Sequence, residues 1–229
     1  MIKSKKIDVV LLCGGKGQRL RPHTLSTPKP LLLVNKKPFL YYMISKFLKL
    51  NVDQIIVATG YKSFKVAKFL NKYFKKNKKI KLVNSGNVDI IKRLKDCSKY
   101  IKNDFFVCYG DTYVSINLNN YIKEFQNKKK YAFVVGTYYK IKYGTVTYNK
   151  KTKIIKKFKE KPTIQDPINL GYFLFKKKLM NNIKKNNSWV KFLENLSKSK
   201  KLFINITDKK YFTFDSPRDY HEIKTRFTM

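Results

Sequence analysis

The residues best suited to chemistry lie in a glycine-rich segment near the start of the chain. Gly14, Gly15 and Gly17 follow an apolar run, and two cations, Arg19 and Lys29, come shortly afterwards. Glycines let a backbone approach a ligand closely and turn its N–H groups toward phosphate. The spacing is not GxGxxG, and the absence of GK[ST] excludes a P-loop. Taken alone, the segment is compatible with phosphate binding and with a plain turn.

A candidate metal ligand follows a second apolar run. Gly110 and Asp111 come directly after the strand expected at residues 104–109, and ligands of open α/β sheets bind beyond the carboxyl ends of strands. The two histidines and three cysteines show no metal-ligand spacing, so any metal is expected to be held by oxygen. One or two carboxylates plus substrate phosphates suffice for Mg²⁺.

The elements that must position these residues follow from the apolar periodicity. Strand-like runs alternate with helix-period segments, which predicts βαβ units on a mainly parallel sheet. In the first half, strands are expected at residues 7–12, 54–60, 80–84 and 104–109, and helices at 38–50, 63–74, 90–101 and 117–127. In the second half, strands are expected at residues 131–137, 144–149, 154–160 and 168–175, followed by helices at 176–183 and 189–198, two short strands and a helix from residue 216. Residues 13–30 are expected to form no helix. The prediction is one α/β domain over residues 1–229, with a mixed sheet flanked by helices.

The charge of +38 raises the question of nucleic acid as a partner. Only 5 of the 52 cations are arginine, and the lysines are spread through every segment. Base readout and bidentate phosphate binding favour arginine, and the aromatic residues fall at core periodicity. No specific nucleic-acid partner is therefore expected, although anionic small substrates would still be attracted.

Targeting signals and disulfides are not predicted. No apolar run approaches the roughly 20 residues that span a bilayer, and the first residues do not resemble a signal peptide. Cys13, Cys97 and Cys108 lie far apart, which fits a reducing compartment. We expect a cytoplasmic protein without membrane contact, and the sequence leaves open whether it forms a homo-oligomer.

The segment LLCGGKGQRLRPHTLSTPKPLLLVNKKPFLYY resembles the signature of the sugar-1-phosphate nucleotidyltransferases. One departure is Gln18, where that family usually has Thr or Ser. Further landmarks follow in the family's order, including IVATGY at residues 56–61, YGD at 109–111, EKP at 160–162, INLGY at 168–172 and FDSPRD at 214–219. The resemblance covers nearly the whole chain. It implies a single GT-A-like, Rossmann-like domain that condenses a nucleoside triphosphate with a sugar 1-phosphate.

The resemblance also implies roles for individual residues. Arg19 would hold the leaving pyrophosphate, Lys29 the α-phosphate and Lys161 the sugar phosphate, while Asp111 and Asp215 would bind Mg²⁺. The nucleotide-binding set would be Leu12, Gly14, Gly15, Gly17, Gln18, Arg19, Lys29, Ser85, Gly86 and Gly110. The sugar-phosphate set would be Gly144, Glu160, Lys161, Asn169 and Gly171.

Residues 84–95 depart from the family's usual TGG element, and they bear on the nucleobase. Ser85-Gly86 followed by Arg93-Leu94-Lys95 resembles the glucose-1-phosphate cytidylyltransferase branch, with Ile91-Lys92 in place of a glycine pair. Cytidylyl transfer is therefore the first expectation, in the service of surface polysaccharide synthesis. A heptose-1-phosphate guanylyltransferase is one alternative, and a nucleotide-binding or sugar-phosphate-binding protein without catalysis is another.

Overall fold

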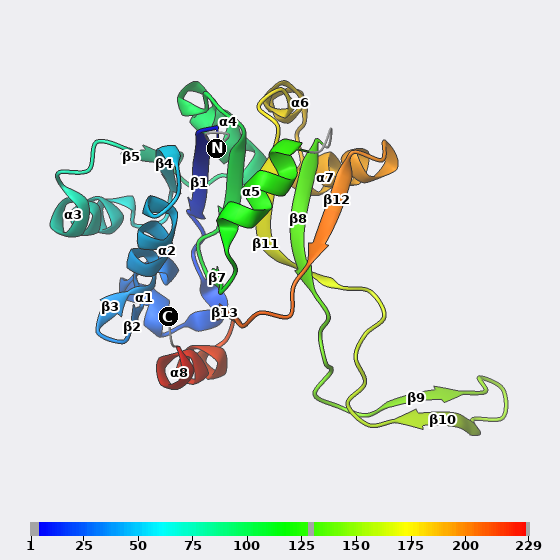
Figure 1. The fold of residues 1–229 in the computed structure, drawn as a ribbon. Coiled ribbons are helices and arrows are strands. Elements are labelled where there is room, and N and C mark those ends of the chain that lie inside the picture. The colour runs from blue at the N-terminus through cyan, green and yellow to red at the C-terminus, as the bar shows by residue number, and fades with distance from the viewer. Residues whose placement is uncertain (1–4, 128–130, 228–229) are drawn as a thin grey trace.

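A seven-stranded sheet forms the centre of the computed structural model, which describes residues 5–127 and 131–227. Its strands are β1 (Ile7–Cys13), β4 (Val52–Thr59), β5 (Ile80–Asn84), β6 (Phe105–Tyr109), β8 (Ala132–Thr137), β11 (Ile168–Phe175) and β12 (Leu202–Ile206), in the order β12-β8-β11-β6-β1-β4-β5 (Figure 1). Neighbouring strands are parallel except at β11, which runs antiparallel to β6 and β8. The predicted mixed, mainly parallel sheet is confirmed.

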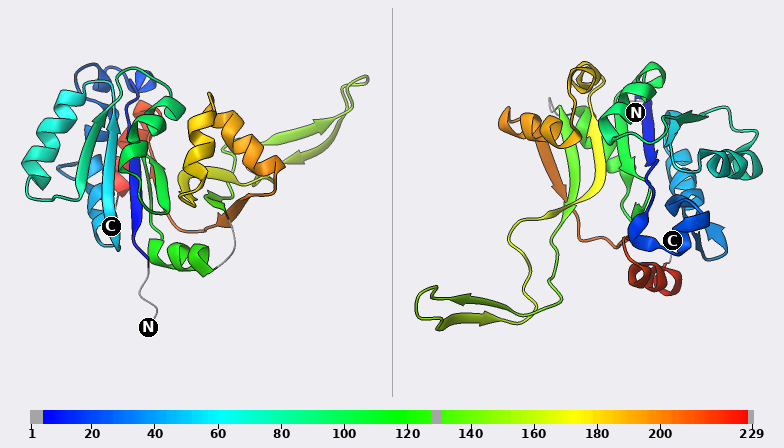
Figure 2. Two further views of the ribbon diagram at one scale, coloured as in Figure 1. Left: turned by 90° about the horizontal axis from the view of Figure 1, so that it is seen from above. Right: turned by 180° about the vertical axis from the view of Figure 1, so that it is seen from behind.

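Helices cover both faces of the sheet (Figure 2). The alternation along β1 explains why: Val9 and Leu11 belong to one buried cluster and Val10 to the other, as side chains of a strand point alternately to opposite faces. The first cluster takes residues from α2 (Phe39–Leu48), α3 (Ser63–Phe74), α5 (Leu118–Asn127) and α8 (Pro217–Arg226). The second takes residues from α4 (Ile90–Cys97), α6 (Leu179–Lys185) and α7 (Trp189–Lys198).

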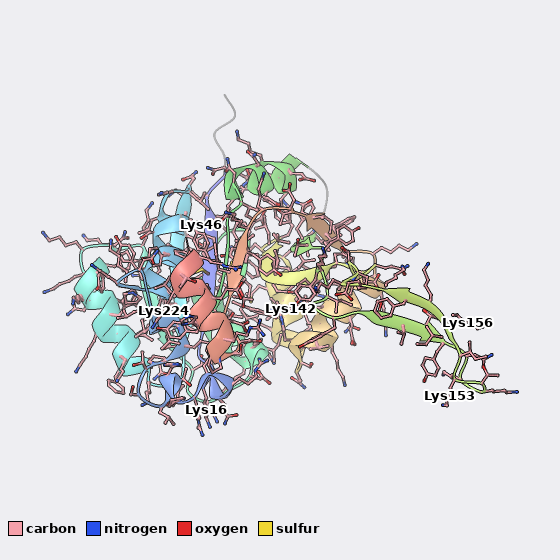
Figure 3. All side chains as sticks on the ribbon, turned by 90° about the horizontal axis from the view of Figure 1, so that it is seen from below. Lys16, Lys46, Lys142, Lys153, Lys156 and Lys224 are labelled. Atoms are coloured by element: carbon pink, nitrogen blue, oxygen red, sulfur yellow. The ribbon has the colours of Figure 1, made fainter. Side chains whose placement is uncertain are left out.

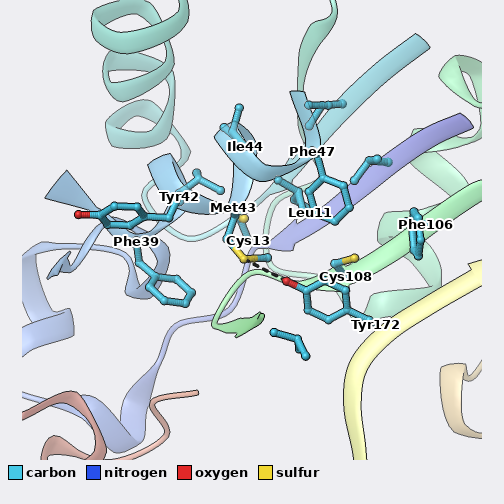
Figure 4. Packing of buried hydrophobic residues seen from close by; sticks show 14 of the residues in the cluster. Leu11, Cys13, Phe39, Tyr42, Met43, Ile44, Phe47, Phe106, Cys108 and Tyr172 are labelled. Carbon is cyan, nitrogen blue, oxygen red and sulfur yellow. Dashed lines mark hydrogen bonds between the residues drawn. The ribbon is translucent and has the colours of Figure 1, made fainter. Parts of the chain in front are cut away.

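Tyr172 ties the first cluster together (Figure 4). This fully buried residue of β11 donates from its hydroxyl to the Thr112 carbonyl at 3.0 Å and to Met43 Sδ of α2 at 3.4 Å. The Phe47 ring of α2 stacks at 6.2 Å between centroids. Burial raises the pKa of Tyr172 well above its usual value, so the hydroxyl stays protonated as a donor.

Several predicted boundaries are wrong. Residues 13–30 do contain a helical turn, α1 (His23–Ser26), flanked by 3₁₀ turns at Gln18–Leu20 and Lys29–Leu31. Pro22 supplies the φ angle of a helix start, and the Thr24 hydroxyl donates to the Gly17 carbonyl at 2.8 Å. The helix expected at 90–101 ends at Cys97 and continues as the 3₁₀ turn Ser98–Tyr100, while the helix expected from residue 176 begins at Leu179.

Short strands lie outside the central sheet. The pairs β2 (Leu33–Val34) with β3 (Lys37–Pro38) and β7 (Thr112–Val114) with β13 (Tyr211–Thr213) are each antiparallel. Of these, only β13 corresponds to a predicted strand.

A hairpin projects from the body of the molecule (Figures 1 and 2). Its strands β9 (Thr145–Tyr148) and β10 (Ile155–Lys159) pair only with each other. We call residues 143–161 the arm. The sequence predicts both strands, but their separation from the central sheet follows only from the tertiary structure. None of the helices in the described residues has the length and apolar character needed to cross a bilayer.

Candidate functional site

The glycine-rich loop leaves β1 at Cys13 and crosses the carboxyl edge of the sheet. Gly17 has φ +61°, a left-handed conformation that L side chains rarely adopt. Within the described residues, the backbone N–H groups of Gly15, Lys16 and Gly17 have no hydrogen-bond acceptor. All three residues line the same cavity. The loop therefore presents unsatisfied donors to a ligand, as anion-binding loops do.

Four charged side chains meet beside this loop. The Lys29 ammonium lies 2.7 Å from an Asp111 carboxylate oxygen and 2.8 Å from an Asp215 oxygen. The other Asp215 oxygen lies 2.9 Å from the Arg19 guanidinium. The Lys29 side chain is only 12% exposed, whereas Arg19 is 78% exposed. Lys29 is thus fixed between two carboxylates, while Arg19 extends into solvent at the rim.

The protonation state of Asp215 follows from these neighbours. Burial alone would raise its pKa, but the Lys29 ammonium and then the Arg19 guanidinium lower it below the usual value. The Asp215 carboxylate is therefore ionised at neutral pH.

A cavity of about 590 Å³ opens between the loop and these charges, within the size range of small-molecule sites. Its lining includes ten of the predicted residues: Leu12, Gly14, Gly15, Gly17, Gln18, Arg19, Lys29, Gly110, Asp111 and Asp215. A hollow of about 900 Å³ beside β13 and α8 is larger, so size does not identify the site. The loop and the clustered charges do.

Arg93 lines the same cavity and was not among the predicted site residues. It is 4% exposed, and its guanidinium donates to the carbonyls of Thr59, Gly86 (3.1 Å) and Val88 (3.0 Å). A Cβ at Gly14 would lie 2.1 Å from Arg93 Cζ, so a side chain there would have to displace the Arg93 guanidinium. Burial lowers the pKa of Arg93. Arg93 thereby joins the end of β4 to the loop after β5.

Four predicted residues lie near the cavity without lining it. Ser85 and Gly86 do not line it, but they directly precede Asn87, which does. Asn169 and Gly171 lie at the start of β11; Asn169 accepts a 2.9 Å hydrogen bond from the Gly171 N–H, and Gly171 packs against the Tyr109 ring, which lines the cavity.

The remaining predicted residues lie on the arm. Gly144, Glu160 and Lys161 are close to one another at the end of the arm nearer the body, where the Lys161 ammonium is 3.2 Å from the Glu160 carboxylate. None of them lines the cavity. The structure therefore does not bring these three residues together with the glycine-rich loop and the charged cluster.

The donor set fits a magnesium ion bound together with substrate. Asp111 and Asp215 both contact one ammonium, and no group of three or more potential metal-binding side chains exists in the described part of the chain. Mg²⁺ keeps waters and uses one or two carboxylates with substrate phosphates. Two carboxylates beside a phosphate-binding loop are sufficient for such a site and insufficient for a cage made of protein ligands alone.

Sequence signals for the missed residues differ in strength. Arg93 is one of five arginines among 52 cations and interrupts a lysine-rich helix, a contrast that singles it out. Tyr109 is the last residue of β6, and its residue type gives no sign of a role in a site. Its hydroxyl accepts a hydrogen bond from Trp189 Nε1 at 3.2 Å. Only the fold reveals that it lines the cavity.

A family model described as "Nucleotidyl transferase" matches residues 8–215. The bifunctional protein GlmU of Methanocaldococcus jannaschii is 34% identical over 188 residues, covering 78% of this chain; the chain spans only 42% of that relative's length. The D-glycero-α-D-manno-heptose 1-phosphate guanylyltransferase of Campylobacter jejuni is 27% identical over 219 residues, covering 94% and 97% of the two chains.

Solved structures give the same fold. HddC from Yersinia pseudotuberculosis superposes with a TM-score of 0.73 at 25% identity, covering 96% of this chain and 99% of that one. The names of the curated relatives specify different nucleotides, including cytidylyl and guanylyl transfer.

Proposed function

Because this chain belongs to the nucleotidyl transferase family, we propose that it transfers a nucleotidyl group from a nucleoside triphosphate to a sugar 1-phosphate, releasing pyrophosphate. The observation that carries this proposal is the junction of Arg19, Lys29, Asp111 and Asp215 beside a loop with free N–H groups. A triphosphate is bound by hydrogen-bond donors and by cations, and the two carboxylates would bind the Mg²⁺ that accompanies it.

The reaction requires the protein mainly to position the two substrates and to neutralise their charge. An ionised oxygen of the sugar phosphate attacks the α-phosphorus, a new P–O bond forms, and the bond to the β-phosphate oxygen breaks to release pyrophosphate. Since the nucleophile is already an anion at neutral pH, no strong base is required. Lys29 would stabilise charge on the α-phosphate, and Arg19 at the rim would hold the leaving pyrophosphate.

Asp111 and Asp215 would hold Mg²⁺ when the triphosphate binds. A bound Mg²⁺ would neutralise phosphate charge and orient the reacting groups. In the structure Lys29 contacts both carboxylates, so it prevents two like charges from facing each other without compensation.

For the nucleobase we propose cytosine first. Ser85-Gly86 and Arg93-Leu94-Lys95 resemble the glucose-1-phosphate cytidylyltransferase branch, and cytidylyl transfer is among the activities named for the curated relatives. Guanylyl transfer to a heptose phosphate is the second candidate, supported by the full-length match to the Campylobacter guanylyltransferase.

The test is pyrophosphate release from each of the four nucleoside triphosphates, with Mg²⁺ and a panel of sugar 1-phosphates. The proposal expects one pair to turn over well above the rest. Binding of a triphosphate without turnover of any pair would instead identify a binding protein of the same fold.

Two variants test the residue roles. Lys29→Ala and Asp111→Asn should each lower kcat by about 10²–10³-fold, the usual cost of removing one preorganised electrostatic group. Lys68→Ala, an exposed lysine of α3, is the matched control and should retain wild-type turnover. Near-normal kcat in Lys29→Ala would remove Lys29 from the reaction.

A further inference from the structure

Arg93 differs from most cations of the chain in its burial. Lysine side chains extend outward over the surface, for example Lys16 of the glycine-rich loop and Lys153 of the arm (Figure 3). Arg93 is only 4% exposed, and yet it lines the cavity beside the glycine-rich loop. The roles proposed above for the phosphates and the metal do not involve it.

The Arg93 guanidinium donates to three carbonyl groups from two segments of the chain. One is the Thr59 carbonyl at the end of β4, and the others are those of Gly86 at 3.1 Å and Val88 at 3.0 Å after β5. A buried guanidinium is costly unless its donors are bonded, and an apolar side chain could fill the same space without that cost. A planar set of donors is therefore what an arginine supplies at this position.

Two of these hydrogen bonds fix peptide planes at the wall of the cavity. A trans peptide unit is planar, and its N–H points away from its C=O. Because the Gly86 carbonyl is held on Arg93, the Asn87 N–H points to the opposite side of that plane. The Val88 carbonyl fixes the Asp89 N–H in the same way. Arg93 thus sets the orientation of two backbone donors.

Both donors belong to exposed residues of the cavity wall. Asn87 and Asp89 line the cavity, and over residues 5–127 and 131–227 their backbone N–H groups have no hydrogen-bond acceptor. Backbone donors of a folded protein are normally paired with protein, water or ligand. These two groups are therefore available to a ligand that enters the cavity.

The phosphate-binding part of the cavity has supports of its own. The Gly14 carbonyl accepts from the Tyr61 N–H at 3.1 Å, and the Gly17 carbonyl accepts from the Thr24 hydroxyl at 2.8 Å. The four charged side chains beside the loop hold one another by ion pairs. Arg93 packs against Gly14 but makes none of these hydrogen bonds or ion pairs. Its loss should therefore change residues 86–89 more than the glycine-rich loop.

We propose that Arg93 is a positioning residue for the nucleoside half of the triphosphate. It holds residues 86–89 so that the free N–H groups of Asn87 and Asp89 meet acceptor atoms of the nucleoside, while the glycine-rich loop and the charged cluster bind the phosphates. This rests on the proposed function, because it takes a nucleoside triphosphate as the ligand of the cavity.

The decisive measurement compares ligands that share the phosphates but not the nucleoside. Calorimetric titration in the presence of Mg²⁺ gives the Kd of each nucleoside triphosphate and of inorganic tripolyphosphate. Arg93→Met should weaken the best-bound nucleoside triphosphate by at least about tenfold, the factor that corresponds to losing one or two ordinary hydrogen bonds. Tripolyphosphate should bind as it does to wild type. Lys92→Met, an exposed change on the same helix, should leave both affinities unaltered.

A purely structural role for Arg93 predicts a different result. Partial unfolding lowers the binding-competent fraction for both ligands alike. Equal losses for the two ligands, or wild-type affinity for the nucleoside triphosphate in Arg93→Met, would overturn this proposal and leave the proposed function intact. A wild type that binds no nucleoside triphosphate would overturn the proposed function, and the role of Arg93 with it.

Two further variants keep the comparison possible if Arg93→Met does not fold. Arg93→Lys retains a cation but lacks the planar donors, so it should lose nucleoside triphosphate affinity by a smaller factor. Arg93→Ala leaves space for a free guanidinium ion. Guanidinium chloride at millimolar concentration, far below denaturing levels, should restore its nucleoside triphosphate affinity, and sodium chloride should not. An equal gain in tripolyphosphate binding would mean that the ion only restores folding, against the proposal.

Discussion

At the scale of single residues, the site depends on side chains whose charges compensate one another. Lys29 neutralises Asp111 and Asp215, and Arg19 adds a second contact to Asp215. These pairs lie at the mouth of the cavity, where solvent screening limits what they add to stability. We propose that their importance is for the ligand, because the same charges would turn toward phosphate and metal when substrate binds.

Arg93 is different because it is buried and bonded to carbonyls rather than to carboxylates. Arg93→Met removes the donors and leaves the Thr59 carbonyl at the end of β4 and the Gly86 and Val88 carbonyls after β5 unsatisfied. We expect the free energy of unfolding to fall by at least about 2 kcal/mol, since each unsatisfied buried group costs about 1–3 kcal/mol. Urea denaturation measures this change.

The control for that experiment is Lys92→Met on the same helix. Lys92 is exposed and pairs with Asp96 at 2.6 Å, and exposed pairs contribute below about 1 kcal/mol. Equal stability losses in the two variants would contradict a bracing role for Arg93.

At the scale of elements, the site residues lie at helix termini and at strand ends. Asp215 precedes α8, whose first turn is a capping box: the Ser216 hydroxyl accepts from the Asp219 N–H at 3.2 Å, and the Asp219 carboxylate accepts from the Ser216 N–H at 3.0 Å. The Asp219 carboxylate also accepts from the Asp215 N–H at 3.2 Å. The cap therefore fixes the backbone that carries a proposed metal ligand.

Ser216→Ala should separate this positioning effect from simple stability. Loss of an N-cap costs about 1 kcal/mol, and turnover should fall as well because Asp215 loosens. Ser188→Ala removes the matching N-cap of α7, where the hydroxyl accepts from the Lys191 N–H at 3.3 Å. That variant should lose similar stability in thermal denaturation but keep its specific activity at temperatures where both are folded.

Helix α2 meets β7 through Lys46, whose ammonium donates to the Val114 carbonyl and lies 4.7 Å from the Tyr113 ring centroid. Burial lowers the pKa of Lys46 from 10.5 to about 8. Because the unfolded chain holds this proton more tightly, its titration adds stability as pH rises from about 8 to about 10.5, and adds none below that window.

Lys46→Met should abolish this contribution. By roughly 1.4 kcal/mol per pKa unit, wild type should gain about 1–3 kcal/mol relative to the variant between pH 8 and pH 10.5. Denaturant titrations at several pH values, with exposed Lys49→Met as the control, measure the difference. A difference independent of pH would mean that Lys46 stays charged in the folded protein.

At the scale of the whole molecule, the charge of +38 acts through the long-range electrostatic field that it creates and not through single contacts. Few of the lysines line the proposed cavity, yet at low ionic strength all of them add to the positive potential that attracts an anionic substrate. We expect kcat/KM for the triphosphate to fall several-fold between about 20 and 200 mM salt, because the Debye length shortens to below about 10 Å. Steady-state kinetics at constant Mg²⁺ tests this; a salt-independent kcat/KM would exclude electrostatic steering.

The sequence alone determined the order of the strands of the central sheet and of the longer helices, together with the glycine-rich loop, because apolar periodicity and glycine placement are local. Helix α3 and strand β5 have the predicted bounds, and the loop residues line the cavity as expected. The tertiary structure decided the rest. Only strand crossover brings Asp215 to Lys29 from 186 residues away, only packing places Arg93 against Gly14, and only the path of the chain separates the arm, with Glu160 and Lys161, from the sheet. These arrangements depend on which distant surfaces meet, and no local pattern of residues encodes that.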